Sequence, residues 1–274
     1  RDGFRTLKAA ANAKVFMQKD NNGLYSVGKH LSKLDFPTDF NSVDRAAQRF
    51  RHVYDAYLKS PGVKTYLSVI PDKNVFIASP NGYPDKDYKA LVERLGSGFP
   101  EAKYIDISGL LSADDFYYTD SHWRQERILK VADEIADKMG AERIGQCEKH
   151  DTGVSFYGVY YGQAALPHAP ERFFYLDNAV IRGLKVYNTE TSSYIPVYDL
   201  GAAAGRDPYE MFLGGARSII RITNPNAAKE RRLVVFRDSF GSSIAPLLAA
   251  GYSEITLVDI RYISPSALGR LIDF

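Results

Sequence analysis

Residues 233–243 read LVVFRDSFGSS, and this stretch predicts a buried strand, a turn and the start of a helix. The apolar run at 233–236 is typical of a strand in the middle of a parallel sheet. The turn after it carries Arg237, Asp238 and Ser239, and Ser242 and Ser243 suit the cap of the next helix. Because sites in open α/β sheets form at the carboxyl ends of strands, we expect Ser239 there, near N–H groups that can hold an oxyanion. The alternative is a turn or capping serine without a catalytic role.

A second stretch, residues 117–123, reads YYTDSHW and places Asp120 two positions before His122. Together with Ser239 it supplies the acid, imidazole and hydroxyl that nucleophilic acyl transfer needs. If Thr119 or Asp120 caps a helix that opens here, His122 lies in its first turn, where the macrodipole keeps the ring neutral, as a general base requires. The alternative is that Asp120 only caps this helix and that His122 bonds locally.

A metal site is a third interpretation of this region. It would use Asp114, Asp115, Asp120 and His122, as in a metal-dependent phosphoesterase. Their spacing matches no known ligand set, so this interpretation ranks last.

Composition excludes several other classes of protein. The chain has 274 residues, 45% hydrophobic and 25% charged, as in an ordinary soluble domain. A formal net charge of +2 argues against nucleic acid as a partner, and the single cysteine, Cys147, excludes an internal disulfide framework and a Cys-rich zinc site. No apolar run approaches the roughly 20 residues of a membrane span. No signal peptide opens the chain, which begins at Arg1 without an initiator Met.

Alternating patterns predict an α/β fold with a mostly parallel central sheet covered by helices. Gly23 to Gly28 predicts a hairpin or edge strand. Strands are expected at 63–70, 103–107, 232–236 and 254–260, and helices at 39–60, 84–95, 244–250, 265–272 and from 120–122 to Gly140. Residues 148–223 are rich in Tyr, Phe, Val and Gly, and predict a β-rich insertion or subdomain within a single domain spanning 1–274.

Asp120-Ser121-His122-Trp123 resembles the motif that names the DHHW proteins, relatives of the SGNH-like alginate O-acetyltransferases. That pattern continues late in the chain with an Asp-Ser-Phe or Asp-Ser-Tyr block, as at 238–240. The likeness extends to residues 23–25, 69–73, 209–215 and 258–262, and so covers most of the chain in the same order.

The resemblance implies a three-layer SGNH-hydrolase-like α/β/α fold with a triad in the order Asp120, His122, Ser239. Ser239 matches the nucleophile, His122 the base and Asp120 the acid. No cofactor and no metal ion are expected. The resemblance also implies an extracytoplasmic protein, anchored or secreted through a segment absent from this chain, beside a membrane-bound acyl-transfer partner. The implied activity moves acetyl groups onto polysaccharide hydroxyls.

Two positions depart from the family pattern. Ser121 replaces the first histidine of the name motif, and Arg237 stands where the Gly-Asp-Ser block has glycine, so its side chain is expected to narrow or recharge the pocket. The chain also stops at Phe274 without an obvious final strand, and the fold's last element is expected beyond it.

The expected function is that of an exported serine O-acetyltransferase or carbohydrate esterase. A second oxyanion donor is expected from Gly214 or Gly215, and a contact to the acceptor from Arg261 or Tyr262 at the end of the following strand. Transfer or hydrolysis depends on whether the pocket admits a sugar hydroxyl in preference to water. The alternative is a non-catalytic polysaccharide-binding or assembly protein, which Arg237 and the 19 tyrosines favour.

Overall fold

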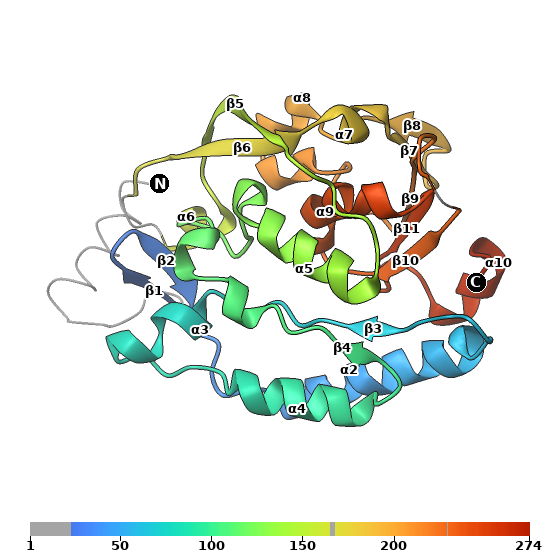
Figure 1. Ribbon diagram of the computed structural model, residues 1–274. Helices are drawn as coiled ribbons and strands as arrows, with labels where there is room; N and C mark the ends of the chain where they lie inside the picture. The colour runs from blue at the N-terminus through green and yellow to red at the C-terminus, as the bar shows by residue number, and fades with distance from the viewer. Residues whose placement is uncertain (1–22, 165–167, 229) are drawn as a thin grey trace, which may run out of the picture. The chain divides into compact units, whose positions relative to one another are not determined.

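The computed structural model describes residues 23–164, 168–228 and 230–274 (Figure 1). The chain divides into two compact units. The first holds the described residues up to His122 together with those of Tyr157–Glu171, and the second holds Trp123–Phe156 and Arg172–Phe274. Both units contain helices and strands, so the predicted α/β class is confirmed.

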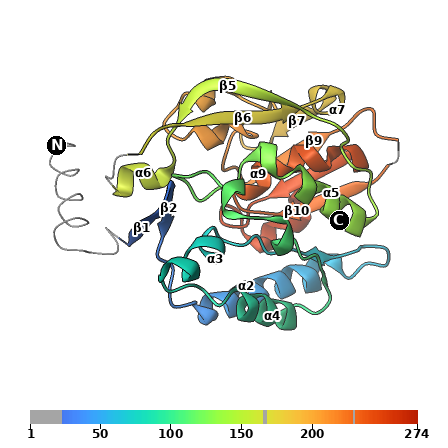
Figure 2. The same cartoon turned by 60° about the vertical axis from the view of Figure 1, so that its left-hand side comes forward.

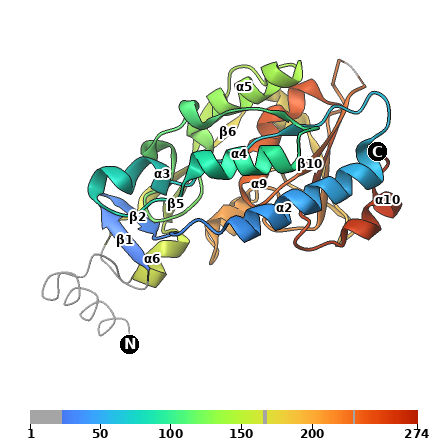
Figure 3. The same cartoon turned by 90° about the horizontal axis from the view of Figure 1, so that it is seen from below.

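The first unit is built from a hairpin, a pair of packed helices and a short parallel strand pair. Figure 3 shows the two helices, α2 and α4, side by side. They lie close because Gly98 of α4 rests on Ala47 of α2, where a Cβ on the glycine would be 2.6 Å from the alanine Cβ. The bounds are β1 Leu24–Val27, β2 His30–Lys33, α2 Phe40–Val53, β3 Tyr66–Leu67, α3 Asn74–Ile77, α4 Tyr88–Gly98, β4 Lys103–Tyr104 and α6 Val159–Ala164.

Local chemistry explains where these elements begin and end. Asp39 caps α2 by accepting from Ser42 N, and Asp87 caps α4 by accepting from Ala90 N. The predicted hairpin at 23–28 is present, with Val27 opposite His30. The strands predicted at 63–70 and 103–107 are present only as the two-residue pairs β3 and β4, which run parallel.

The second unit contains a five-stranded sheet in the order β10-β11-β9-β7-β8. Only β10 and β11 are parallel; the other three pairings are antiparallel, so the prediction of a mostly parallel sheet is wrong. The β7–β8 pair is a hairpin whose short connection requires antiparallel strands, whereas β9 pairs with β7 and β11, which lie far from it in the sequence. The bounds are β7 Lys185–Asn188, β8 Ser193–Ile195, β9 Ile219–Thr223, β10 Arg232–Phe236 and β11 Glu254–Val258.

The remaining elements of the second unit include a separate two-stranded ribbon of β5 and β6, which run side by side in Figure 2. The bounds are α5 Leu129–Met139, β5 Glu148–Phe156, β6 Glu171–Asp177, α7 Ala179–Gly183, α8 Leu200–Ala203, α9 Phe240–Ile244 and α10 Leu268–Leu271. The predicted helix at 244–250 is present as a 3₁₀ segment, Ala245–Gly251, because Pro246 cannot continue the hydrogen-bond ladder of α9. Among these described elements, none is a helix with the length and hydropathy of a membrane span.

The helix after the Asp-x-His segment starts later than predicted. Residues 118–122 form turns and bends, Gln125–Arg127 is a single 3₁₀ turn, and α5 begins only at Leu129. It ends where predicted, at Gly140, whose φ of 63° suits glycine. The expectation that His122 lies in the first turn of a helix is therefore wrong.

Candidate active site

The loop 117–122 of the first unit is organised around the buried side chain of Asp120. One carboxylate oxygen, Oδ1, accepts from His122 N at 2.9 Å and lies 2.6 Å from His122 Nδ1. The other, Oδ2, accepts from Val159 N at 2.8 Å. Tyr117 N donates to His122 O at 3.0 Å and closes the loop. Asp120 therefore holds the imidazole with one oxygen and the segment after β5 with the other, and it does not cap a helix as the alternative interpretation required.

The ionisation of Asp120 decides which tautomer His122 adopts. Burial by itself raises the pKa of Asp120, but the hydrogen bond and charge of His122 and the N–H groups of His122 and Val159 outweigh it and hold the pKa below its usual value. An ionised carboxylate only accepts, so His122 Nδ1 carries the hydrogen and Nε2 carries the lone pair of the neutral ring. The carboxylate thus sets the tautomer that a general base requires and stabilises the imidazolium once Nε2 has taken a proton.

Three backbone N–H groups fix Asp120 and its neighbour Thr119 to the segment 158–160. Gly158 N donates to Thr119 Oγ1 at 2.9 Å and Tyr160 N to Thr119 O at 3.0 Å, beside the Val159 bond already described. A Cβ on Gly158 would lie 2.4 Å from Thr119 O and from Asp120 Cβ. A glycine is therefore required at the point where the two segments touch.

Ser239 lies in the second unit, in the strand–turn–helix arrangement that the sequence predicted. The strand β10 ends at Phe236 and the helix α9 begins at Phe240. Asp238 shapes the turn by accepting from Phe240 N at 3.0 Å through Oδ1, and Ser239 O accepts from Ser242 N at 3.1 Å. Ser239 thus follows the carboxyl end of a strand and precedes the first turn of a helix.

Arg237 is folded inward, with 9% of its surface exposed. Its aliphatic stem covers Gly241, where a Cβ would lie 2.6 Å from the Arg237 Cβ. Its guanidinium donates to Gly215 O at 3.3 Å and to Asp238 O at 3.2 Å. Burial lowers the pKa of Arg237, and the nearby Asp259 carboxylate opposes that shift. The side chain therefore joins the Ser239 loop to the turn at 213–215.

The turn at 213–215 has three successive residues at positive φ: Leu213 at 55°, Gly214 at 70° and Gly215 at 75°. Glycine tolerates this conformation, which explains its presence at two of these positions. The Gly215 N–H donates to Phe212 O at 3.1 Å, and the Gly215 carbonyl receives Arg237. Of the two glycines, Gly214 is the better candidate for the predicted oxyanion donor.

Arg261 and Tyr262 follow β11, as expected, but their side chains are used differently. Arg261 makes a two-point bond to the buried Asp259 carboxylate, at 2.8 Å from Nε and 2.6 Å from Nη2. Its guanidinium carbon also lies 5.5 Å from the Tyr262 ring centroid. Tyr262 is 58% exposed. Contact with an acceptor stays a prediction for both.

Sequence analysis missed the residues that anchor α9, the helix that Ser239 precedes. The Ser243 hydroxyl accepts from Trp123 Nε1 at 2.8 Å and from Tyr209 OH at 2.7 Å, and donates to Phe240 O at 3.2 Å. Gln125 Nε2 donates to Ser243 O at 2.7 Å. The Trp123 ring also meets the Phe240 ring edge to face, with centroids 5.4 Å apart. The only signal in the sequence was the tryptophan of the name motif, whose partner cannot be identified from spacing.

The acidic residues of the metal interpretation have other partners. Asp115 Oδ2 accepts from Ser112 N and Ser112 Oγ, each at 2.9 Å, and Asp114 Oδ1 lies 3.7 Å from His30 Nε2. Over the described ranges, 23–164, 168–228 and 230–274, no three His, Cys, Asp or Glu side chains are grouped to hold a metal ion.

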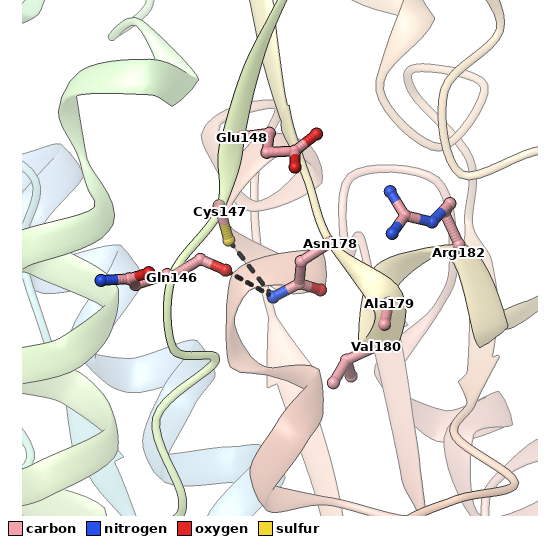
Figure 4. Close-up of a pocket in the computed structure, with 7 residues that line it drawn as sticks. All are labelled: Gln146, Cys147, Glu148, Asn178, Ala179, Val180 and Arg182. Atoms are coloured by element: carbon pink, nitrogen blue, oxygen red, sulfur yellow. Dashed lines mark hydrogen bonds between the residues drawn. The ribbon is translucent and has the colours of Figure 1, made fainter.

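A hollow of about 440 Å³ lies elsewhere in the second unit. Figure 4 shows its lining, in which Asn178 Nδ2 donates to Gln146 O at 3.2 Å and contacts Cys147 Sγ at 3.4 Å. None of the predicted site residues lines it.

Two solved structures support the fold. A DHHW family protein from Eubacterium siraeum has a TM-score of 0.73 and 18% identity, covering 92% of this chain and 88% of its own. Bacillus cereus PatB1, solved with a sulfonyl adduct, has a TM-score of 0.69 and 17% identity, covering 89% and 87%. The O-acetyltransferase domain of Pseudomonas putida AlgJ is a weaker match, with a TM-score of 0.45, 14% identity and coverage of 57% and 64%.

No curated protein sequence matches the chain. The family model for the DHHW protein matches residues 112–258, which is more than half of the chain and includes both the Asp-x-His loop and the Ser239 turn. The resemblance inferred from the sequence motifs is thereby confirmed, and the chain belongs to the DHHW protein family.

Proposed function

We propose that this chain is a serine-dependent O-acetyltransferase or carbohydrate esterase that acts on acetyl groups of cell-surface polysaccharide. The observation that carries the proposal is the 2.6 Å contact between His122 Nδ1 and the buried Asp120 carboxylate. A short, charge-assisted bond of this kind orients an imidazole and stabilises its cation when Nε2 takes a proton. Such a pair is what an acyl-transfer base needs.

In the proposed reaction Ser239 Oγ attacks the carbonyl carbon of an acetyl ester. Its proton passes to His122 Nε2, and the charge that develops on the carbonyl oxygen is held by the Ser239 amide and by a second donor from the turn at 213–215, for which Gly214 is the candidate. The ester C–O bond then breaks, and the leaving alcohol takes the proton from His122. This leaves acetyl-Ser239. An acceptor hydroxyl attacks that ester while His122 Nε2 takes its proton, and Ser239 Oγ regains a proton as it leaves.

The wider setting belongs to the same proposal. The three-layer SGNH-hydrolase-like arrangement, the extracytoplasmic location and the membrane-bound acyl-transfer partner come from the family resemblance. A sugar hydroxyl as acceptor gives transfer, whereas water gives hydrolysis. The structure of PatB1, one of the similar proteins, carries a sulfonyl adduct. Sulfonyl reagents react with activated nucleophiles, and this supports a nucleophile in the proposed site.

Hydrolysis of an activated acetyl ester tests the proposal, with and without added oligosaccharide. We expect turnover by the wild type and its loss in Ser239→Ala and His122→Ala, each folded by circular dichroism. Acetylated sugar in the product identifies a transferase, and free acetate alone identifies an esterase. If all three proteins are folded and equally inert, the enzyme proposal fails, and the non-catalytic polysaccharide-binding protein becomes the better account.

A further inference from the structure

Lys73 is a buried lysine at the start of α3, with 1% of its surface exposed. Its ammonium donates to three backbone carbonyls: Tyr117 O at 2.9 Å, Tyr118 O at 3.1 Å and Asp120 O at 2.7 Å. A lysine ammonium has three donors and no acceptor, so this arrangement uses its full hydrogen-bonding capacity. The three bonds converge on one stretch of main chain.

That stretch is the loop that carries the proposed acid and base. The Lys73 bonds fix the carbonyls on both sides of Thr119, and so fix the main chain from which the Asp120 carboxylate projects. Burying a charged ammonium is costly unless its donors are satisfied, and here three loop carbonyls accept from them. A purely structural lysine is the competing explanation, and the experiment must separate the two.

A second contact holds the same loop from the segment after β5. Lys73 Nζ lies 5.6 Å from the centroid of the Tyr160 ring, and Tyr160 N donates to Thr119 O. Thr119 and Asp120 are thus fixed by the ammonium on one side and by residues 158–160 on the other. The position of His122 depends on both, because Asp120 Oδ1 holds its N–H and its Nδ1.

We propose that Lys73 is a positioning residue, whose ammonium sets the geometry of the Asp120–His122 pair for proton transfer. The expected change in kcat rests on the proposed function. The geometry of the Asp120–His122 pair can be measured without any substrate. Lys73 does not contact the reacting atoms. It acts through the main chain of the loop.

The test compares Lys73→Met with Asn74→Ala as a matched control. Asn74 is also buried, on the same helix, and its side chain makes three bonds, accepting from Tyr25 OH and Ser32 Oγ and donating to Lys33 O. Those partners belong to the β1–β2 hairpin, which reaches the loop through Leu31 N, a donor to Tyr118 O at 2.7 Å. Asn74→Ala therefore removes bonds to the hairpin and leaves the three Lys73 bonds to the loop in place. Both variants lose buried hydrogen bonds, so both are expected to lower the thermal midpoint.

Only Lys73→Met is expected to change catalysis. We expect kcat to fall by about 10- to 100-fold with KM changed by less than about twofold, because a shift of an ångström in a catalytic group has effects of this size. Asn74→Ala is expected to keep kcat within about twofold of the wild type. A kcat that falls equally in both variants, or in neither, overturns the proposal.

The second readout is the strongly downfield proton resonance of the His122 Nδ1–H, assigned by its loss in His122→Ala. It is expected in the wild type and in Asn74→Ala, and is expected to shift or vanish in Lys73→Met. If the wild type has no esterase activity, the proposed function fails but this resonance still tests Lys73. If Lys73→Met does not fold, Lys73→Gln, which keeps a donor amide without the charge, replaces it with the same expected outcomes. An unchanged resonance in the folded variant overturns the proposal.

Discussion

At the scale of single residues, the ionised state of Asp120 determines what His122 can do. The carboxylate has no proton to give, so the Nδ1–H tautomer follows from the 2.6 Å contact. Replacing Asp120 by Asn keeps the shape but turns one of two accepting oxygens into an NH2 donor, so His122 Nδ1–H and Val159 N–H can no longer both find an acceptor. The neutral amide also loses the charge that stabilises the imidazolium.

We therefore expect Asp120→Asn to lower kcat by about 10²- to 10⁴-fold with little change in KM. The matched control is Asp114→Asn, because the Asp114 side chain lies in the same region of the sequence but is 70% exposed and pairs with His30. Its activity is expected to stay within about twofold of the wild type. Steady-state ester hydrolysis measures both, and equal losses in the two variants would contradict the assigned role of Asp120.

At the scale of elements, α9 is held in place by the hydroxyl of Ser243. Replacing Ser243 by Ala leaves Trp123 Nε1 and Tyr209 OH buried without their acceptor, at a cost of about 1–3 kcal/mol each. We expect the free energy of unfolding in urea to fall by about 2–4 kcal/mol.

Ser242 provides the control for this substitution. It is buried to the same degree, but among the described residues its Oγ has no hydrogen-bond partner. Ser242→Ala is therefore expected to change stability by less than about 0.5 kcal/mol. If the two alanine variants are equally stable, the hydrogen bonds to Ser243 do not anchor α9.

A second element-scale prediction concerns the contact between residues 158–160 and the Asp120 loop. A methyl group on Gly158 has no room, so Gly158→Ala is expected to destabilise the protein by about 1–3 kcal/mol and to reduce kcat. Gly162→Ala is the control, because the space around Gly162 is open and alanine favours its helix, α6. Thermal unfolding and ester hydrolysis of both variants check this, and a Gly158→Ala protein as stable and active as the wild type would refute it.

At the scale of the whole molecule, the depressed pKa of Asp120 links folding to pH. A carboxyl whose pKa is lower in the folded state than in the unfolded state stabilises the fold above the unfolded value, near pH 4. That contribution is lost as pH falls through the lower folded value. We expect the stability difference between the wild type and Asp120→Asn to be constant above about pH 5 and to shrink on further acidification. Urea unfolding between pH 2 and 7 measures it, and a difference that grows on acidification would contradict the assignment.

In the second unit, the strands β10 and β11 could be predicted from the sequence, because both are apolar runs bounded by turn residues. The direction of the other strands could not, because antiparallel pairing of β7, β8 and β9 is decided by long-range partners. The start of α5 was misplaced because Asp120 looks like a capping residue, whereas its oxygens hold His122 and Val159. The single-domain organisation and the 148–223 insertion stay predictions.

The residues of the candidate site were also only partly predictable from the sequence. Asp120, His122 and Ser239 could be named from short motifs, whereas Lys73, Gln125 and Ser243 could not, since each acts on a partner far along the chain. Asp120 and His122 belong to the first unit and Ser239 to the second. Whether the three residues act together is therefore the first question for an experiment.

The most direct test is the rate at which an aryl sulfonyl fluoride labels Ser239, located by peptide mass spectrometry, in the wild type, His122→Ala and Asp120→Asn. Only a serine whose proton is taken by a neighbouring base reacts quickly with such a reagent. We expect a single labelled residue, Ser239, with a rate that falls at least about 100-fold in His122→Ala and also falls in Asp120→Asn. Labelling of Ser239 at the same rate in all three proteins, or no labelling of Ser239 in the folded wild type, would contradict this expectation.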